Sequence, residues 1–265
     1  MNRQIIACLF TILFFLACEV GEDFIPDNPI DPSNPDYIAP QISITTSPNE
    51  GETVSSAQFT FSWDGNRDGM LYRYALDQRW SGWKENQKIV TIQHMDEGAH
   101  AFNVQSSYSS GDSSSVASVS FIVDAVKGPS LLFFPRFSQA GVGQTLQLSL
   151  LAEEVTNLSG AEIVLSFDAS IIEIVNITKG ELFNELGQII FIEDHSSSNT
   201  VTISTAVWGE NKPTANGTKS LAEIQVKVKQ TGSTVIEIQN SSSLRDPNNQ
   251  EITINQSIGG IIESN

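Results

Sequence analysis

The sequence predicts an all-β protein built from two β-sandwich domains. Apolar and polar residues alternate over many short segments, which is the period-2 pattern of half-buried strands. Turn residues separate these segments at intervals typical of sandwiches. No convincing helical pattern interrupts the second half of the chain. We therefore expect one sandwich over residues 41–124 and a second, of about nine strands, over residues 129–265, with Asp124–Gly128 as the joint.

The chain is strongly acidic. Its 265 residues include 31 Asp and Glu against 14 Lys and Arg. Such a surface repels phosphate backbones and anionic lipid, which argues against a nucleic-acid partner and against membrane contact through surface charge. Both cysteines, Cys8 and Cys18, precede the predicted domains, which therefore contain no disulfide, thiolate nucleophile or Cys-ligated metal.

Residues 1–17 are expected to be a signal peptide. Arg3 precedes an apolar run that is too short to span a bilayer comfortably. The run ends F-L-A-C, which resembles a bacterial lipobox with Phe15 in place of the more usual Leu. The resemblance implies lipid attachment to Cys18 and a lipoprotein anchored at the outer membrane or cell surface. A plain secretory signal or an uncleaved anchor is the alternative.

Residues 18–40 are expected to form a tether. Five prolines and six acids occur here, without Lys or Arg. Proline restricts the backbone and the like charges repel, so the segment should be an extended spacer. The acids that follow Cys18 could instead be a sorting signal for surface export, but a solvated linker is the simpler interpretation.

The first domain begins with a strand whose Phe59, Phe61 and Trp63 share one face. Later segments read F-S-W-D, Y-R-Y-A-L-D, W-S-G-W, D-E-G-A-H-A-F-N-V-Q and F-I-V-D. Their order resembles the immunoglobulin or fibronectin type III-like modules of bacterial surface proteins. The resemblance implies a spacer or docking unit, because this fold assigns no chemistry by itself.

Two features of the first domain are candidate sites. Asp64, Asn66 and Asp68 match the first half of a calcium loop, although Ala75 stands where the bidentate carboxylate belongs; turn chemistry explains the same residues. Trp80 and Trp83 could stack on sugar rings, but packing in the core or at the edge of the sandwich is the simpler interpretation.

The second domain is organised around two strands and the turn between them. The first strand directs Ile163, Leu165 and Phe167 to one side and Glu162, Val164 and Ser166 to the other. A polar turn at residues 168–170 precedes a second apolar series. Further on, we expect a long polar excursion over residues 209–219, followed by a strand over residues 222–228.

The order of these parts resembles the cohesin family. The matching phrases are G-Q-T-L-Q-L-S-L, N-L-S-G, S-F-D-A-S-I-I-E-I, K-G-E-L-F, S-L-A-E-I-Q-V-K-V, G-S-T-V-I-E-I and L-R-D-P-N-N-Q-E-I. The resemblance implies a nine-stranded jelly-roll sandwich that binds dockerin modules without catalysis, through a sheet face that includes residues 161–167. It places Glu162, Val164 and Ser166 on that face; the alternative is the ordinary solvent side of a sheet.

No catalytic motif is present. Glu193, Asp194 and His195 are sequence neighbours in a polar stretch, whereas a triad depends on convergent geometry. Phosphate-loop, H-E-x-x-H and G-x-S-x-G motifs are absent, and no cofactor is expected.

The sequence thus predicts a non-catalytic lipoprotein that binds a dockerin-bearing partner, plausibly in polysaccharide degradation. A carbohydrate-binding protein that uses Trp80, Trp83 or Trp208 is the second hypothesis. A structural or adhesive envelope protein without a dedicated ligand is the third.

Overall fold

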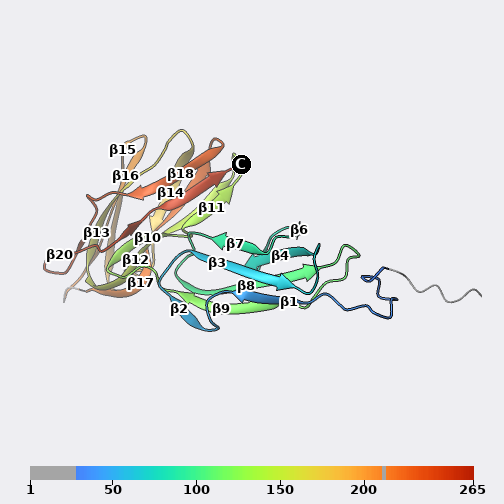
Figure 1. Ribbon diagram of the computed structural model, residues 1–265. Helices are drawn as coiled ribbons and strands as arrows, with labels where there is room; N and C mark the ends of the chain where they lie inside the picture. Colours follow the sequence, from blue (N-terminus) through green and yellow to red (C-terminus); the bar gives the residue numbers. More distant parts are fainter. Residues whose placement is uncertain (1–27, 211–212) are drawn as a thin grey trace, which may run out of the picture.

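The protein is all-β, as predicted. A computed structural model describes residues 28–210 and 213–265, so the expected signal peptide and Cys18 lie outside the described residues. The described residues form twenty-two strands in four sheets and no helix (Figure 1). Accordingly, they include no helix long and apolar enough to cross a membrane.

The first sandwich packs a three-stranded sheet against a six-stranded one. The smaller sheet has the order β1 (Ile42–Thr46), β3 (Phe59–Gly65), β7 (Ile89–Ile92). The larger has the order β2 (Glu52–Val54), β9 (Ala117–Val123), β8 (Gly98–Ser107), β4 (Leu71–Leu76), β5 (Arg79–Trp80), with β6 (Lys84–Glu85) also paired to β4. Phe61 of one sheet stacks on Phe102 of the other with 4.0 Å between ring centroids, so aromatic rings fill this core.

The second sandwich has nine strands of five or more residues, as predicted, and four shorter ones among the described residues. One sheet has the order β14 (Ile172–Lys179), β17 (Ala215–Val228), β12 (Thr145–Leu158), β10 (Ser130–Phe134), β21 (Ser257–Ile258). The other has the order β11 (Phe137–Ala140), β22 (Gly260–Ser264), β18 (Gly232–Ile238), β13 (Gly160–Ser166), β16 (Thr200–Trp208), β15 (Gln188–Ser197). Off this path, β19 (Ser243–Arg245) pairs with β13 and with β20 (Glu251–Ile252).

The polar excursion predicted for residues 209–219 is wrong in its second half. Strand β17 already begins at Ala215, because Ala215 and Gly217 pair with Leu158 and Val155 at the end of β12. The segment A-N-G-T-K-S is polar and carries no apolar alternation, so its strand state depends on pairing with a distant segment.

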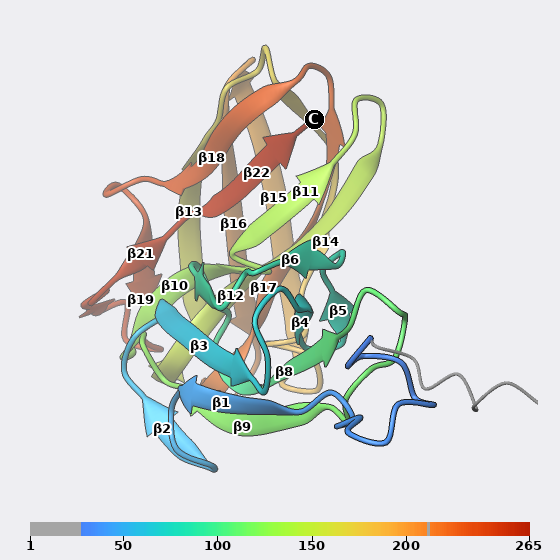
Figure 2. The same cartoon turned by 45° about the vertical axis from the view of Figure 1, so that its right-hand side comes forward.

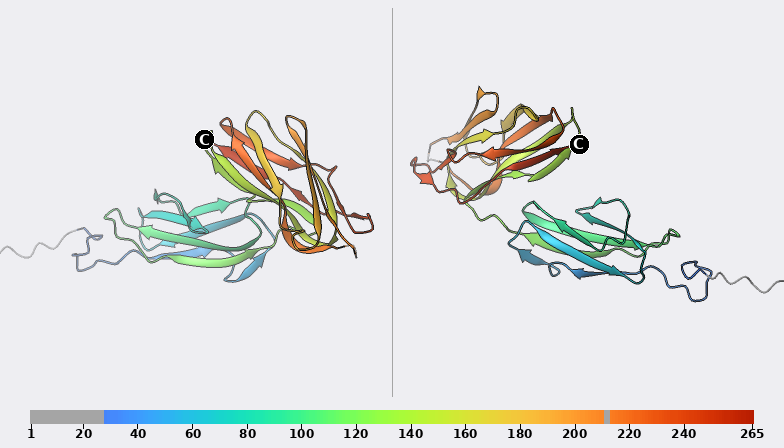
Figure 3. Two further views of the ribbon diagram at one scale, coloured as in Figure 1. Left: turned by 180° about the vertical axis from the view of Figure 1, so that it is seen from behind. Right: turned by 45° about the horizontal axis from the view of Figure 1, so that its top comes forward.

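The two sandwiches meet at one end of the first, with their long axes at an angle, and the chain enters the first sandwich at the opposite end (Figures 1 and 3). At that remote end, the Tyr108 hydroxyl donates to the Ile38 carbonyl and the Asn66 amide donates to the Ala39 carbonyl. The ten residues of β8 span about 33 Å. The first domain therefore separates the preceding segment from the second domain by roughly one strand length.

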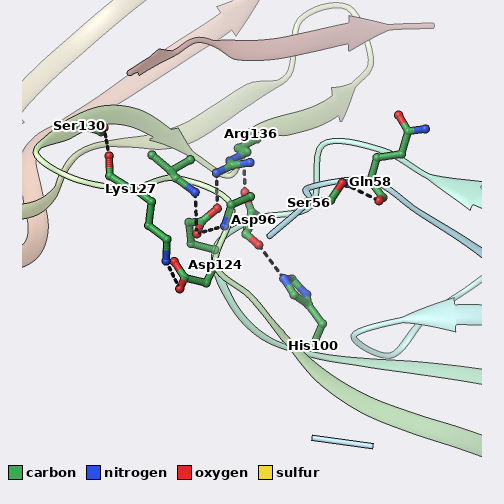
Figure 4. Close-up of polar contacts among 11 residues, drawn as sticks. Ser56, Gln58, Asp96, His100, Asp124, Lys127, Ser130 and Arg136 are labelled. Carbon is green, nitrogen blue, oxygen red and sulfur yellow. Dashed lines mark hydrogen bonds and ion pairs between the residues drawn. The ribbon is translucent and has the colours of Figure 1, made fainter. Parts of the chain in front are cut away.

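A buried ion pair joins the two domains. The Arg136 guanidinium, just before β11, contacts the Glu97 carboxylate, and the two side chains are only 5% and 15% exposed. The Arg136 backbone N–H donates to Asp96 Oδ1 at 2.7 Å, and the Asp96 carbonyl accepts from the His100 ring at 2.8 Å (Figure 4). The second Glu97 oxygen accepts from the backbone of Ala125 at 2.9 Å. Residues 96 and 97 thus connect the first sandwich, the linker and the second sandwich.

The linker itself has little freedom. The Gly128 N–H donates to Glu154 Oε2 at 2.9 Å and its carbonyl accepts from Asn255 Nδ2 at 2.7 Å. A Cβ at Gly128 would lie 2.2 Å from the Glu153 carbonyl oxygen, so only glycine fits this close approach. The predicted joint at Asp124–Gly128 is therefore hydrogen-bonded to both domains.

Removal of Arg136 should destabilise the joint. Arg136→Ala leaves the largely buried Glu97 carboxylate without its cation, which costs about 3–5 kcal/mol of unfolding free energy for a buried pair. Urea denaturation measures the loss, and small-angle scattering should show a broader distribution of interdomain distances. Lys127→Ala, which removes an exposed ion pair in the same linker, is the control and should change neither readout appreciably. An unchanged scattering profile for Arg136→Ala would contradict this role.

Glu153 is a second ionisable group near the joint. It is 9% exposed, and its Oε2 has no hydrogen-bond partner among the described residues. Desolvation by burial raises the pKa of its carboxyl group, with neighbouring carboxylates such as Glu97 acting in the same direction.

Stability should consequently fall as pH rises through the raised folded-state pKa of Glu153, because the folded state binds this proton more tightly than the unfolded state. Glu153→Gln removes the ionisation and should raise Tm more at pH 8 than at pH 5. Glu173→Gln, at an exposed position of β14, is the control. Equal Tm changes for Glu153→Gln at both pH values would exclude the effect.

Candidate functional site

The outward side chains of β13, β16 and β15 form one uncovered surface, which we call the outer face. The side chains of Ile163 and Leu165 point into the core, whereas Glu162 is exposed and Val164 and Ser166 are partly exposed. The alternation predicted for this strand is confirmed. Strand β16 lies beside it, with Glu162 opposite Ser204 and Val164 opposite Thr202. Strand β15 completes the row, with Ile192 opposite Ser204 and Asp194 opposite Thr202.

Large apolar side chains are exposed along the outer edge of this surface. Ile190, Ile192 and Trp208 are 40%, 58% and 68% exposed. Such residues on a sheet that is otherwise rich in hydroxyl groups are typical of protein contact surfaces, which mix apolar and hydrogen-bonding groups. Sequence reasoning predicted a strand at residues 189–192 but missed its contribution to the site, because nothing local shows which strand neighbours β13.

A shallow hollow of about 760 Å³ lies at one end of the outer face. Glu162, Ile190 and Trp208 line it from the sheet, and Arg245 and Asp246 line it from the segment after β18. That segment closes against β13: the Gln239 N–H donates to the Val164 carbonyl, and the Val164 N–H donates to Ser242 Oγ. The hollow is open and lies on the sheet surface rather than within the core.

The electrostatics of the outer face are mainly acidic. Glu162, Asp194 and Glu237 come from β13, β15 and β18 of the same sheet, and Glu162 and Asp194 form no ion pair with any described residue. Arg245 is the nearby cation, with Glu251 at 3.8 Å. The face therefore favours basic groups on anything that binds to it.

The acid–histidine stretch beside this face has no triad geometry. His195 Nε2 lies 3.3 Å from Glu193 Oε2 on an exposed strand, and Ser197 Oγ donates to Asn199. Across residues 28–210 and 213–265, no group of three or more His, Cys, Asp or Glu side chains is placed to hold a metal ion.

The weak calcium candidate in the first domain has structural partners. Asp64 pairs with Lys88 at 3.2 Å. The Asn66 side chain accepts from the Gln41 N–H and donates to the Ala39 carbonyl and the Tyr108 hydroxyl. These contacts hold the incoming chain against the sandwich, which accounts for the polar turn without a cation.

Trp80 and Trp83 share a cation. The Arg73 guanidinium lies 4.6 Å from the ring centroids of both residues, and Arg73 also donates twice to Gln105 Oε1. The two rings are 39% and 38% exposed. Stacking on Arg73 holds the β5 and β6 segments against β4, which gives both tryptophans a packing role at the sheet edge. Trp208 lies apart from them, beside the outer face.

Residues 135–262 match the cohesin domain model. The matched region includes the whole outer face. A search of curated proteins found no match.

Solved cohesins have a similar fold over about half of this chain. A non-cellulosomal cohesin from Archaeoglobus fulgidus is 16% identical, with a TM-score of 0.43, covering 51% of this chain and 90% of its own. The sixth cohesin of scaffoldin B from Acetivibrio cellulolyticus, solved with a Cel5 dockerin, is 12% identical, with a TM-score of 0.47, covering 52% of this chain and 100% of its own. A type II cohesin–X-dockerin complex from Acetivibrio cellulolyticus matches at 21% identity, with a TM-score of 0.43. The match covers 51% of this chain and 98% of the solved chain.

Proposed function

We propose that the cohesin domain binds a dockerin-type protein module through the outer face, and that the protein does so as a lipoprotein at the cell envelope. The observation that carries the proposal is the uncovered sheet surface on which Ile190, Ile192 and Trp208 stand beside hydroxyl and carboxylate groups. No catalytic function is proposed, since the acidic and histidine side chains near the face do not converge.

Sheet geometry supports a rigid, preformed contact surface. Ladder hydrogen bonds hold β13 between β16 on one side and β18 and β19 on the other. Their inward side chains form a continuous core with the opposite sheet, so the outward side chains have a fixed spacing. Preorganisation of this kind lowers the entropic cost of binding. Glu162, Val164 and Ser166 are proposed to contact the partner near the centre of the face.

The anchoring part of the proposal rests on residues 1–40. Lipid at Cys18 would hold the chain at the membrane, and the anionic surface would repel the acidic segment that follows. The extended spacer predicted for residues 18–40 is wrong over residues 28–37, which form successive turns and pack Ile30 and Tyr37 against the core of the first sandwich. The first sandwich, which the chain enters at the end remote from the joint, then places the cohesin domain farther from the membrane (Figure 3). Such a display suits a protein that holds an enzyme near a polymer, and this is why a role in polysaccharide degradation is proposed.

Ile192→Asp should abolish binding to a dockerin module. The change places a charge in the exposed apolar row, where the partner would remove it from water, and we expect at least a hundredfold rise in Kd, about 2.7 kcal/mol. Isothermal titration against a panel of purified dockerin modules, including those encoded near this gene, measures the effect.

The matched control is Val175→Asp, which places the same charge at another exposed apolar position, on β14 in the opposite sheet. Its Kd should stay within about twofold of the wild-type value. Failure of every module to bind the wild-type protein, or equal losses for both variants, would reject the proposed face. Retention on insoluble glycan that disappears in Trp208→Ala would favour carbohydrate binding instead.

Cys18→Ser should release the protein from the membrane fraction. A lipidated Cys18 incorporates labelled fatty acid and partitions into detergent, whereas the variant has no sulfur for the thioether at this position. Labelling in the native host, followed by fractionation, measures both properties. Cys8→Ser, inside the expected signal peptide, is the control and should retain the label. Equal labelling of the Cys18→Ser variant would exclude lipidation there.

A further inference from the structure

The outer face continues beyond the three strands described above. Glu237 of β18 lies opposite Ser166 of β13. Val235, two residues earlier on β18, lies opposite Ile261 of β22, which in turn lies opposite Phe137 of β11. Because directly paired residues point to the same side of a sheet, these side chains belong to the same surface as Glu162 and Ile192. The surface therefore crosses all six strands from β15 to β11.

The first domain forms a wall at the β11 end of this surface. A groove of about 880 Å³ lies between the domains, with β11 and β22 on one side and β7 and the 93–97 loop on the other. The His94 ring of the first domain lies parallel to the Phe137 ring of the second, with 6.4 Å between centroids. Figure 2 shows β11 and β22 above the strands of the first sandwich.

The joint holds the two walls of the groove together. Arg136, whose guanidinium contacts Glu97, directly precedes β11, and its carbonyl accepts from the Ile261 N–H of β22 at 2.8 Å. Glu97 and Asp96 themselves belong to the first-domain wall. The Arg136–Glu97 ion pair therefore also holds the two walls of the groove at a fixed separation.

The groove and the outer face have the same charge. Four carboxylates and one arginine line the groove: Asp77, Asp96, Glu97, Glu263 and Arg79. Of these acids, Glu97 is paired with Arg136 and Asp77 contacts the His100 ring, so Asp96 and Glu263 contribute most of the negative charge. Glu162, Asp194 and Glu237 continue this acidic character along the sheet. One basic partner surface therefore complements both regions.

The dimensions match a single bound module. Six neighbouring strands span about 24 Å at roughly 4.8 Å per interval. A compact domain of roughly 65 residues has a radius of gyration of about 11 Å, and hence a width of about 25–30 Å. A module centred on β13 would reach the groove without any movement of the two domains.

We propose that the interdomain groove is the second half of the docking surface, so that a basic module seated on the outer face also contacts the first domain along β7 and the 93–97 loop. This inference rests on the proposed function, since it assigns further contacts to the same partner. The first domain then serves as part of the binding site as well as a spacer.

The test introduces a positive charge into the first-domain wall of the full-length protein. Thr91→Lys places a cation on β7 in the groove, and the matched control Ser43→Lys places one on β1, at the opposite edge of the same sheet. With a dockerin module whose binding is lost in Ile192→Asp, Thr91→Lys should raise Kd at least about fivefold at low salt, and Ser43→Lys should change it less than about twofold. Unchanged Tm values exclude a folding defect.

Hydrogen exchange with the same module provides a second readout. Backbone amides of residues 89–97 should exchange more slowly in the complex than in the free protein. Wild-type affinity of Thr91→Lys together with unchanged exchange over 89–97 would overturn the inference while leaving the proposed function intact. Binding that is insensitive to Ile192→Asp would reject the proposed function itself.

Discussion

The contact between Arg136 and Glu97 connects every functional part of this molecule. It joins the start of the cohesin-like sandwich to the loop of the first sandwich that also receives the linker backbone. A buried arginine and carboxylate are costly to desolvate, and the linker N–H groups of Ala125 and Val126, which donate to Glu97, offset part of that cost. Such a pair fixes the orientation of the two domains more than it stabilises them. An apolar contact could bury the same surface, but it would not fix the angle between the domains. The position of the outer face relative to the first domain follows from this ion pair.

The second constraint is the period of the β-strand. In the sheet that contains β13, the inward apolar side chains pack in the core shared with the opposite sheet. The outward side chains point away from that core and can therefore vary without loss of packing. The exposed Ile192 and Trp208 are therefore unexplained by folding, whereas Ile163 and Leu165 are fully explained by it. This division between core and surface is why the match to the cohesin domain identifies the fold more directly than the partner.

The first domain shows structural contacts for the polar and aromatic motifs that the sequence offered as candidate sites. The Asp64–Asp68 stretch has the composition of a cation loop, yet Asn66 uses its amide to hold the incoming chain. Trp80 and Trp83 resemble sugar platforms in sequence, yet each packs one face on Arg73. Asp96 and Glu97, in contrast, make the interdomain contacts, although their sequence is that of a common turn and carries no sign of this role.

The sequence alone determined the fold class, the two domains and the direction of the β13 side chains, because alternation and turn chemistry are local properties. Glu162, Val164 and Ser166 could be placed on a common face from their spacing alone. Only the tertiary structure decided which strands adjoin them: β16 and β18 pair with β13 across intervals of tens of residues, and A-N-G-T-K-S became a strand only by pairing with β12. The sequence likewise could not show the partner of Arg136, because Glu97 lies 39 positions away along the chain. Side-chain direction depends on backbone geometry at one residue, whereas strand neighbours and buried ion pairs depend on how the whole chain closes.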